Sequence, residues 1–153
     1  MAETGDFGVP SSYKRILLGY DGSDNAMRAL QSAITMTKEG GGTLSVIVVA
    51  DTLSYQSRYM MRYYKHLRDD IIRYAKEQLS KAIETAEAKG ITSVQGAVEE
   101  GHPAEMILAR ASDANADLII VGRRGLRGIQ KYLLGSVSSS IVSHSTCDVM
   151  VIK

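Results

Sequence analysis

The residues best suited to chemistry gather in one stretch, from Gly122 to Ser138. This stretch contains four glycines and four cationic side chains, Arg123, Arg124, Arg127 and Lys131. No Asp or Glu occurs from Leu118 through Cys147. The whole chain is nearly neutral, with 18 Lys and Arg against 17 Asp and Glu, so this stretch is a local positive field.

Each of these residue types suits the binding of a phosphate chain. Glycine lets a backbone approach a ligand closely and adopt positive φ, and successive free N–H groups form an anion-binding concavity. Gly135 and Ser136 open a predicted helix, whose first N–H groups lack partners and whose dipole favours an anion. Ser136 and Ser138 add hydroxyl donors. The alternative is a surface loop with a solvated basic face, and the residue types alone do not decide between the two.

The position of this stretch favours a ligand site. It follows a predicted strand at Leu118–Val121 and spans about 13 residues before the next helix, where a βα loop normally takes about 2–6. Asp21 follows the first predicted strand in the same way. Ligands of open α/β sheets bind beyond the carboxyl ends of strands, where the strand order reverses. If the first and fourth strands are neighbours, Asp21 and Gly122 flank that crevice. Neither the dinucleotide pattern Gly-x-Gly-x-x-Gly nor the P-loop pattern occurs.

Strand-like and helix-like patterns alternate along the chain, which predicts a parallel sheet with helices on both faces. The apolar runs predict strands at Arg15–Tyr20, Thr43–Ala50, Ile91–Val98, Leu118–Val121 and Val149–Ile152. The first helix is expected to begin at the cap Ser23 and end at Gly40–Gly42. Its expected core face is Met27, Leu30, Ala33 and Ile34. The second helix is expected to bury an apolar stripe, made of Met60, Tyr63, Tyr64, Leu67, Ile71, Tyr74, Ala75, Leu79, Ala82, Ile83 and Ala86, and to close at Gly90. The third helix is expected to start at Pro103, and the fourth spans about Ser136 to Ser143.

Length and composition indicate one globular domain. The chain has 153 residues, of which 44% are hydrophobic and 23% charged. We expect a flexible tail at residues 1–12 and a single domain at 13–153. The net charge of +1 provides no field that would recruit nucleic acid or an anionic membrane. No apolar run approaches the ~20 residues of a membrane span, and the first residues do not form a signal-peptide pattern. The lone Cys147 suits a reducing compartment, so we expect a cytoplasmic protein.

The sequence resembles the universal stress protein family, of the ATP-binding type, over residues 13–153. That type carries Gly-x-x-Gly, nine residues, and then Gly-Ser/Thr, and Gly122, Gly125 and Gly135-Ser136 match this spacing. The stretches that also match are Ile16–Ser23, Ala116–Gly122, Gly135–Ser138 and Cys147–Ile152. One departure is Cys147-Asp148, where Cys-Pro is common in the family, and it bears on the entry of the final strand.

The resemblance implies a Rossmann-like α/β fold, a five-stranded parallel sheet of order 3-2-1-4-5, with ATP as its ligand. By resemblance, Asp21 and Val49 approach the adenine end, and Val121 and Gly122 lie near the ribose. The residues that hold the phosphates would be Gly125, Gly135, Ser136, Val137 and Ser138. We expect Mg²⁺ to arrive with the triphosphate rather than to be held by protein groups. On the residues alone, Asp21 could instead end a strand and shape a turn.

We expect a nucleotide-dependent regulatory or stress-response switch that acts on an unknown protein partner. No nucleophile–base pair is evident and no acid lies in the glycine-rich loop, so no catalytic residue is assigned. The alternatives are a slow ATPase and a nucleotide-free interaction module. The three histidines, His66, His102 and His144, have no carboxylate or cysteine at metal-ligand spacing, so no metal site is expected.

Two surface features remain from the sequence. The final strand, Val149, Met150, Val151 and Ile152, is apolar and would lie at a sheet edge, which predicts a homodimer paired through it. The alternative is that residues 1–12 cover this edge.

Residues 52–66 are rich in Tyr and Arg. Helical spacing favours core packing for part of this segment, whereas Tyr55, Arg58, Tyr59 and Arg62 could form a lid or a partner surface.

Overall fold

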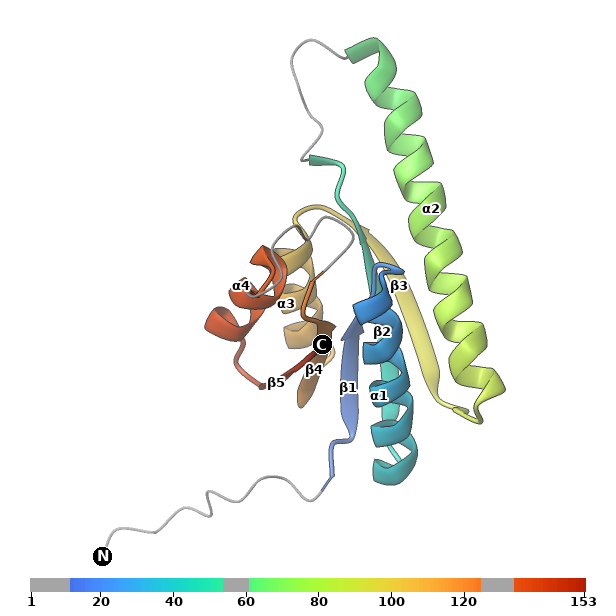
Figure 1. Cartoon of the computed structure of the whole chain (residues 1–153), viewed down its shortest axis with the longest axis vertical. Helices are drawn as coiled ribbons and strands as arrows, with labels where there is room; N and C mark the ends of the chain where they lie inside the picture. The colour runs from blue at the N-terminus through green and yellow to red at the C-terminus, as the bar shows by residue number, and fades with distance from the viewer. Residues whose placement is uncertain (1–11, 54–60, 125–133) are drawn as a thin grey trace, which may run out of the picture.

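The computed structural model describes residues 12–53, 61–124 and 134–153. Strands and helices alternate along this part of the chain (Figure 1). The elements are β1 Arg15–Gly19, α1 Asp24–Gly40, β2 Thr43–Ala50, α2 Met61–Ala88, β3 Val94–Glu100, α3 Pro103–Asp113, β4 Leu118–Gly122, α4 Ser136–His144 and β5 Asp148–Ile152. The predicted tail, residues 1–12, lies almost entirely outside the described residues.

The five strands form one parallel sheet of order β3-β2-β1-β4-β5, which confirms the predicted fold class. β1 is central, and its Leu17 pairs with Ser45 of β2 on one side and Ile119 of β4 on the other. The third strand starts later than the predicted Ile91. The reason is that Ile91 closes α2, with its N–H donating to the Ala86 carbonyl at 3.0 Å after Gly90 adopts a φ of 90°.

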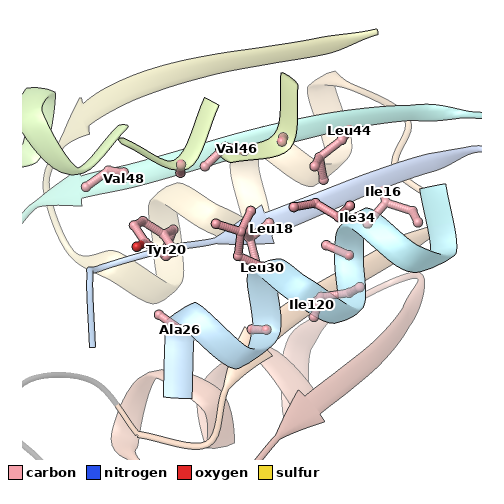
Figure 2. Packing of buried hydrophobic residues seen from close by; sticks show 14 of the residues in the cluster. Ile16, Leu18, Tyr20, Ala26, Leu30, Ile34, Leu44, Val46, Val48 and Ile120 are labelled. Carbon is pink, nitrogen blue, oxygen red and sulfur yellow. The ribbon is translucent and has the colours of Figure 1, made fainter. Parts of the chain in front are cut away.

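Both faces of the sheet are covered, as right-handed crossovers to either side of β1 require. α1 and α2 pack on one face, where Leu18, Leu30 and Ile120 belong to one apolar cluster (Figure 2). α3 and α4 pack on the other, where Leu17 and Ile119 meet Ile107 and Ile141. Alternate residues of each central strand therefore enter different cores, and each buried aliphatic side chain contributes about 1.5–3 kcal/mol.

α1 has the predicted caps, and Leu30, Ala33 and Ile34 of its predicted core face are buried. The Ser23 hydroxyl accepts the Ala26 N–H at 3.2 Å, and Gly41 ends the helix in the left-handed region with φ 62°. The prediction that Met27 faces the core is wrong, since 49% of Met27 is exposed. Ala26 and Ala29 are buried in its place, and these small side chains let the first turns of the helix approach the sheet closely.

α2 is longer than the strands that it covers. Ala75, Ala82 and Ala86 are buried against the sheet. Leu67 and Tyr74 were predicted to lie in the core but are 37% and 43% exposed. The first turns of α2 stand beyond the strand ends, where no sheet lies beneath them (Figure 1). Met60 and the side chains of Tyr63 and Tyr64 are outside the described part of the chain.

No helix among the described residues is long and apolar enough to cross a membrane.

α3 begins as predicted, with Pro103 in its first turn. α4 extends one residue beyond the predicted end, to His144, whose ring nitrogen Nδ1 lies 2.8 Å from the Ser140 carbonyl oxygen.

A single carboxylate joins the starts of β1 and β4. Asp117 accepts the backbone N–H groups of Lys14 at 3.0 Å and Arg15 at 2.9 Å, one on each oxygen. The Arg15 guanidinium lies 3.8 Å from the same carboxylate. These bonds fix the register of β1 against β4, two strands that are distant in the sequence. The bonds lie at the amino ends of the strands, whereas the predicted site lies at the carboxyl ends.

We therefore predict that Asp117→Ala lowers the free energy of unfolding by about 1–3 kcal/mol, because two backbone donors lose a charged acceptor. Urea denaturation measures the loss. Asp113→Ala is the matched control, since Asp113 is exposed at the end of α3, and its change should stay within about 0.5 kcal/mol. Equal losses in both variants would contradict the proposed role of Asp117.

Candidate functional site

The candidate site lies at the carboxyl ends of β1 and β4, which are neighbours as the sequence argument required. Gly19 of β1 pairs with Val121 of β4. From β1 the chain continues through α1 to β2, on one side of the β1/β4 pair. From β4 it continues through α4 to β5, on the other side of that pair. The strand order therefore reverses between β1 and β4, which is where open α/β sheets bind ligands.

The two ends of the long connection after β4 are hydrogen-bonded to each other. The Arg123 carbonyl oxygen accepts the Gly135 N–H at 2.9 Å and the Ser138 hydroxyl at 2.9 Å. The neighbouring Arg124 carbonyl accepts weaker bonds, 3.4 Å from the Ser23 hydroxyl and 3.5 Å from the Asn25 amide. The base of this connection is thus tied to the start of α4 and to the start of α1. The predicted residue Gly125 lies outside the described residues.

Two of the predicted glycines are required by packing within the chain. A Cβ on Gly122 would lie 2.9 Å from the backbone carbon and the Cβ of Asn25. A Cβ on Gly135 would lie 3.1 Å from the Arg123 carbonyl oxygen, closer than a carbon normally comes to it. The sequence analysis explained these glycines by the approach of a ligand. The structure adds that they allow α1 and α4 to close on the end of β4.

The start of α4 is suited to an anion. Its N-cap is Gly135, which supplies no side-chain acceptor, and its first turn contains no acidic residue. The first-turn residues are the predicted Ser136, Val137 and Ser138. The hydroxyl of Ser138 is buried and donates to the Arg123 carbonyl, so its part in the site is to hold the loop base, while its backbone N–H stays in the first turn.

Arg123 carries a second signal for an anion. Its Nε is buried and has no hydrogen-bond partner among the described residues. A buried charged donor without an acceptor is costly, and a bound anion would supply the acceptor. The backbone of Arg123 is fully engaged, since its N–H donates to the Ile152 carbonyl of β5 at 2.6 Å.

The residues predicted for the nucleoside end lie at the same edge of the sheet. Asp21 follows β1, half-buried, and its Oδ1 accepts the Ser23 N–H at 3.0 Å, so it also shapes the turn. Val49 lies near the end of β2 and packs in the α3/α4 cluster together with Val121. All the predicted site residues that the structure describes therefore meet around the carboxyl ends of β1, β2 and β4.

Two side chains of α2, Gln78 and Tyr74, lie close to the turn after β1, and the sequence did not predict them. Tyr20 is buried beside Asp21, and burial raises the pKa of Tyr20, with a further rise from the charges of Asp21 and Tyr74. Gln78 and Tyr74 reach the next residue of the turn, Gly22. One signal was present in the sequence: Gln78 is a polar residue within the buried stripe of α2, between Ala75 and Ala82.

The described residues include no group of three or more His, Cys, Asp or Glu side chains placed to hold a metal ion. Of the predicted histidines, His102 directly precedes α3 and His144 ends α4. Cys147 is half-buried against the α3/α4 cluster. Within residues 52–66, positions 54–60 and the side chains of 61–64 are not described.

Comparison with known proteins identifies relatives over nearly the whole chain. The model of the universal stress protein family matches residues 12–153. A putative universal stress protein of Staphylococcus aureus (strain USA300) is 34% identical over 143 residues, covering 93% of this chain and 85% of that protein.

Solved structures give the same picture of the fold. The universal stress protein UspA from Lactobacillus plantarum aligns with a TM-score of 0.84 at 24% identity, over 94% of this chain and 99% of its own. A universal stress protein solved in complex with cAMP aligns with a TM-score of 0.65 at 27% identity, over 94% of this chain and 98% of its own.

Proposed function

This chain belongs to the universal stress protein family, and we propose that it binds ATP at the carboxyl edge of its sheet and works as a nucleotide-dependent regulatory switch. The observation that carries the proposal is the anchored loop base beside an uncapped helix start, with the buried Nε of Arg123 lacking an acceptor among the described residues. A relative of similar fold was solved in complex with cAMP, an adenine nucleotide, which supports the class of ligand.

A triphosphate suits the electrostatics better than a single phosphate does. The start of α4 and Arg123 supply donors for an anion, and the same connection carries three further cations, Arg124, Arg127 and Lys131. The proposed phosphate contacts are Gly125, Gly135, Ser136, Val137 and Ser138. Val121 and Gly122 would lie along the ribose, and Asp21 and Val49 at the adenine. Mg²⁺ would accompany the phosphates.

A route from the nucleotide to the surface runs through Arg123. Its carbonyl holds the loop base and its N–H holds the Ile152 carbonyl of β5, so one peptide segment links the proposed phosphate site to the outermost strand. This link supports a switch that responds to the nucleotide and acts on a protein partner. We propose no catalytic residue and expect the protein in the cytoplasm.

Mass spectrometry of the denatured, purified protein tests the proposal most directly. Release of ATP supports the switch, and release of ADP supports the slow ATPase. A protein that carries no nucleotide and fails to bind added ATP would contradict the proposal and favour the nucleotide-free interaction module.

We predict that Gly135→Val lowers the affinity for ATP by about a hundredfold, the equivalent of losing one to two hydrogen bonds to charged groups. The added carbons would meet the Arg123 carbonyl and open the loop base. Calorimetry measures the affinity, and circular dichroism checks the fold. Gly41→Ala is the control, because Gly41 caps α1 at the far edge of the sheet, and unchanged binding is expected. A folded Gly135→Val protein with wild-type affinity would remove the proposed site.

We predict that Asp21→Ala weakens the binding of ATP more than that of inorganic triphosphate. The carboxylate is assigned to the nucleoside end, since beside phosphates it would repel them. Competition titrations with both ligands give the two affinities. An equal loss for ATP and triphosphate would show that Asp21 does not read the nucleoside.

The free edge of β5 supports the proposed homodimer. The Ile152 carbonyl points toward β4, where it accepts the Arg123 N–H. N–H and C=O groups of successive strand residues alternate between the two edges, so Val149 and Val151 present theirs to the outside. Apolar surface continues beside this edge on the helices that contact β5, at Met27 of α1 and Val142 of α4. A second copy related by a two-fold axis would pair there antiparallel.

We predict that Val151→Pro turns a dimer into a monomer while leaving the fold intact. Proline removes the outward N–H of Val151 and spares the bonds that β5 makes to β4. Light scattering at micromolar concentration measures the mass, and Val151→Thr is the control that keeps the N–H. A monomeric wild type would contradict the dimer and favour coverage of the edge by the tail.

A further inference from the structure

α2 contacts the turn that carries Asp21, through two side chains that no site assignment includes. Gly22 has a φ of 81°, and a Cβ placed on it would lie 2.5 Å from the Oε1 of Gln78 and 3.1 Å from the hydroxyl of Tyr74. Gln78 is only 8% exposed, whereas Tyr74 is 43% exposed. The amide of Gln78 is therefore packed directly against the backbone of the turn.

We propose that Gln78 and Tyr74 are positioning residues, which hold the Asp21–Gly22 turn in the geometry that recognises the nucleoside end of the ligand. The inference rests on the proposed function and adds α2 to the determinants of specificity. Among the described residues outside the turn, the three atoms nearest to that Cβ position all belong to Gln78 and Tyr74. Glycine at this position has wide conformational freedom, so the turn needs such a support to hold one shape.

Hydrogen bonds of the neighbouring residues hold the turn on both sides of Gly22. The Tyr20 N–H donates to the Ile47 carbonyl at 2.9 Å, which anchors the residue before Asp21 to β2. The Ser23 N–H donates to Asp21, and the Ser23 hydroxyl caps α1. Between these two anchors, the packing of Gln78 and Tyr74 adds a restraint on the Asp21–Gly22 peptide.

α2 is rigid enough to give this support. Its first half is tied to the end of β3 by Arg68, whose guanidinium makes two bonds to Glu100, at 2.9 and 2.7 Å. Thr52, at the end of β2, adds a 3.5 Å contact to the same carboxylate. Farther along, Ala75 and Ala82 are buried against the sheet on either side of Gln78. The helix is thus held both before and after the two positioning residues.

The proposed phosphate contacts lie elsewhere, at the base of the connection after β4 and the start of α4. Changes at Gln78 should therefore alter nucleoside recognition and leave phosphate binding intact. The readout that separates positioning from a merely structural role is the ratio of the dissociation constants of inorganic triphosphate and ATP. Loss of folding would weaken both ligands together, whereas loss of positioning weakens ATP alone.

The experiment measures this ratio by competition titration for the wild type, Gln78→Ala, Tyr74→Phe and Asp21→Ala. We expect Gln78→Ala to lower the ratio by about tenfold and Tyr74→Phe by about threefold, both through weaker ATP binding. Glu77→Ala, on the exposed face of the same helical turn, is the matched control and should leave the ratio within about twofold of the wild type.

A double variant tests the contact itself. Gly22→Ala should lower the ratio for two reasons: a side chain is strained at a φ of 81°, and the new methyl group displaces Gln78. Adding Gln78→Ala makes room for that methyl group, so the double variant should lose less than the sum of the two single losses. Simple additivity would overturn the inference that Gln78 acts through Gly22.

The remaining outcomes separate this inference from the proposed function. If Asp21→Ala lowers the ratio while Gln78→Ala and Tyr74→Phe leave it unchanged, the positioning role is overturned and the proposed function stands. A wild type that binds ATP no better than triphosphate overturns nucleoside recognition, and with it both proposals. A ratio that falls equally in Glu77→Ala also overturns the inference, because the effect would then belong to α2 in general.

Discussion

The pairing of β1 with β4 is the contact on which the rest of the structure depends. It joins segments that are far apart in the sequence, and Asp117 sets its register from one end by holding the first residues of β1. This pairing places β2 and β3 on one side and β5 on the other, so that α1 and α2 cover one face and α3 and α4 the opposite face. The reversal of strand order, and hence the crevice, exists only because these two strands are neighbours.

The same pairing explains why residues at the crevice serve both packing and binding. Gly122 lets α1 approach the end of β4, and Gly135 lets α4 approach the Arg123 carbonyl. A helix that starts this close to the strand ends brings its free N–H groups to the crevice. Packing thus requires glycine at positions that belong to the proposed anion site, and a substitution that harms packing is expected to harm the proposed binding as well.

The crevice is connected to two outer surfaces. Arg123 links the loop base to β5, the last strand of the sheet. On the other side, Gln78 and Tyr74 link the turn after β1 to α2, which Arg68 and Glu100 fasten to β3. A ligand at the centre of the sheet would thus contact segments that are held by its outermost strands, which is the arrangement a binding-dependent switch needs.

The sequence by itself determined the order of elements and their approximate bounds, because strand periodicity and helix caps are local signals. The strand order of the sheet was predicted only through the resemblance to the family. Ser23, Gly41 and Pro103 mark helix ends through their own chemistry, so they were readable without a structure. Helical spacing also predicted the buried Leu30, Ala33 and Ile34 of α1. Only the tertiary structure decided that Met27 is exposed, since its exposure depends on how closely the helix meets the sheet. It also decided that Gln78 and Tyr74 reach Gly22 and that Arg123 holds Gly135, Ser138 and Ile152, because such contacts join elements whose separation in space no local pattern encodes.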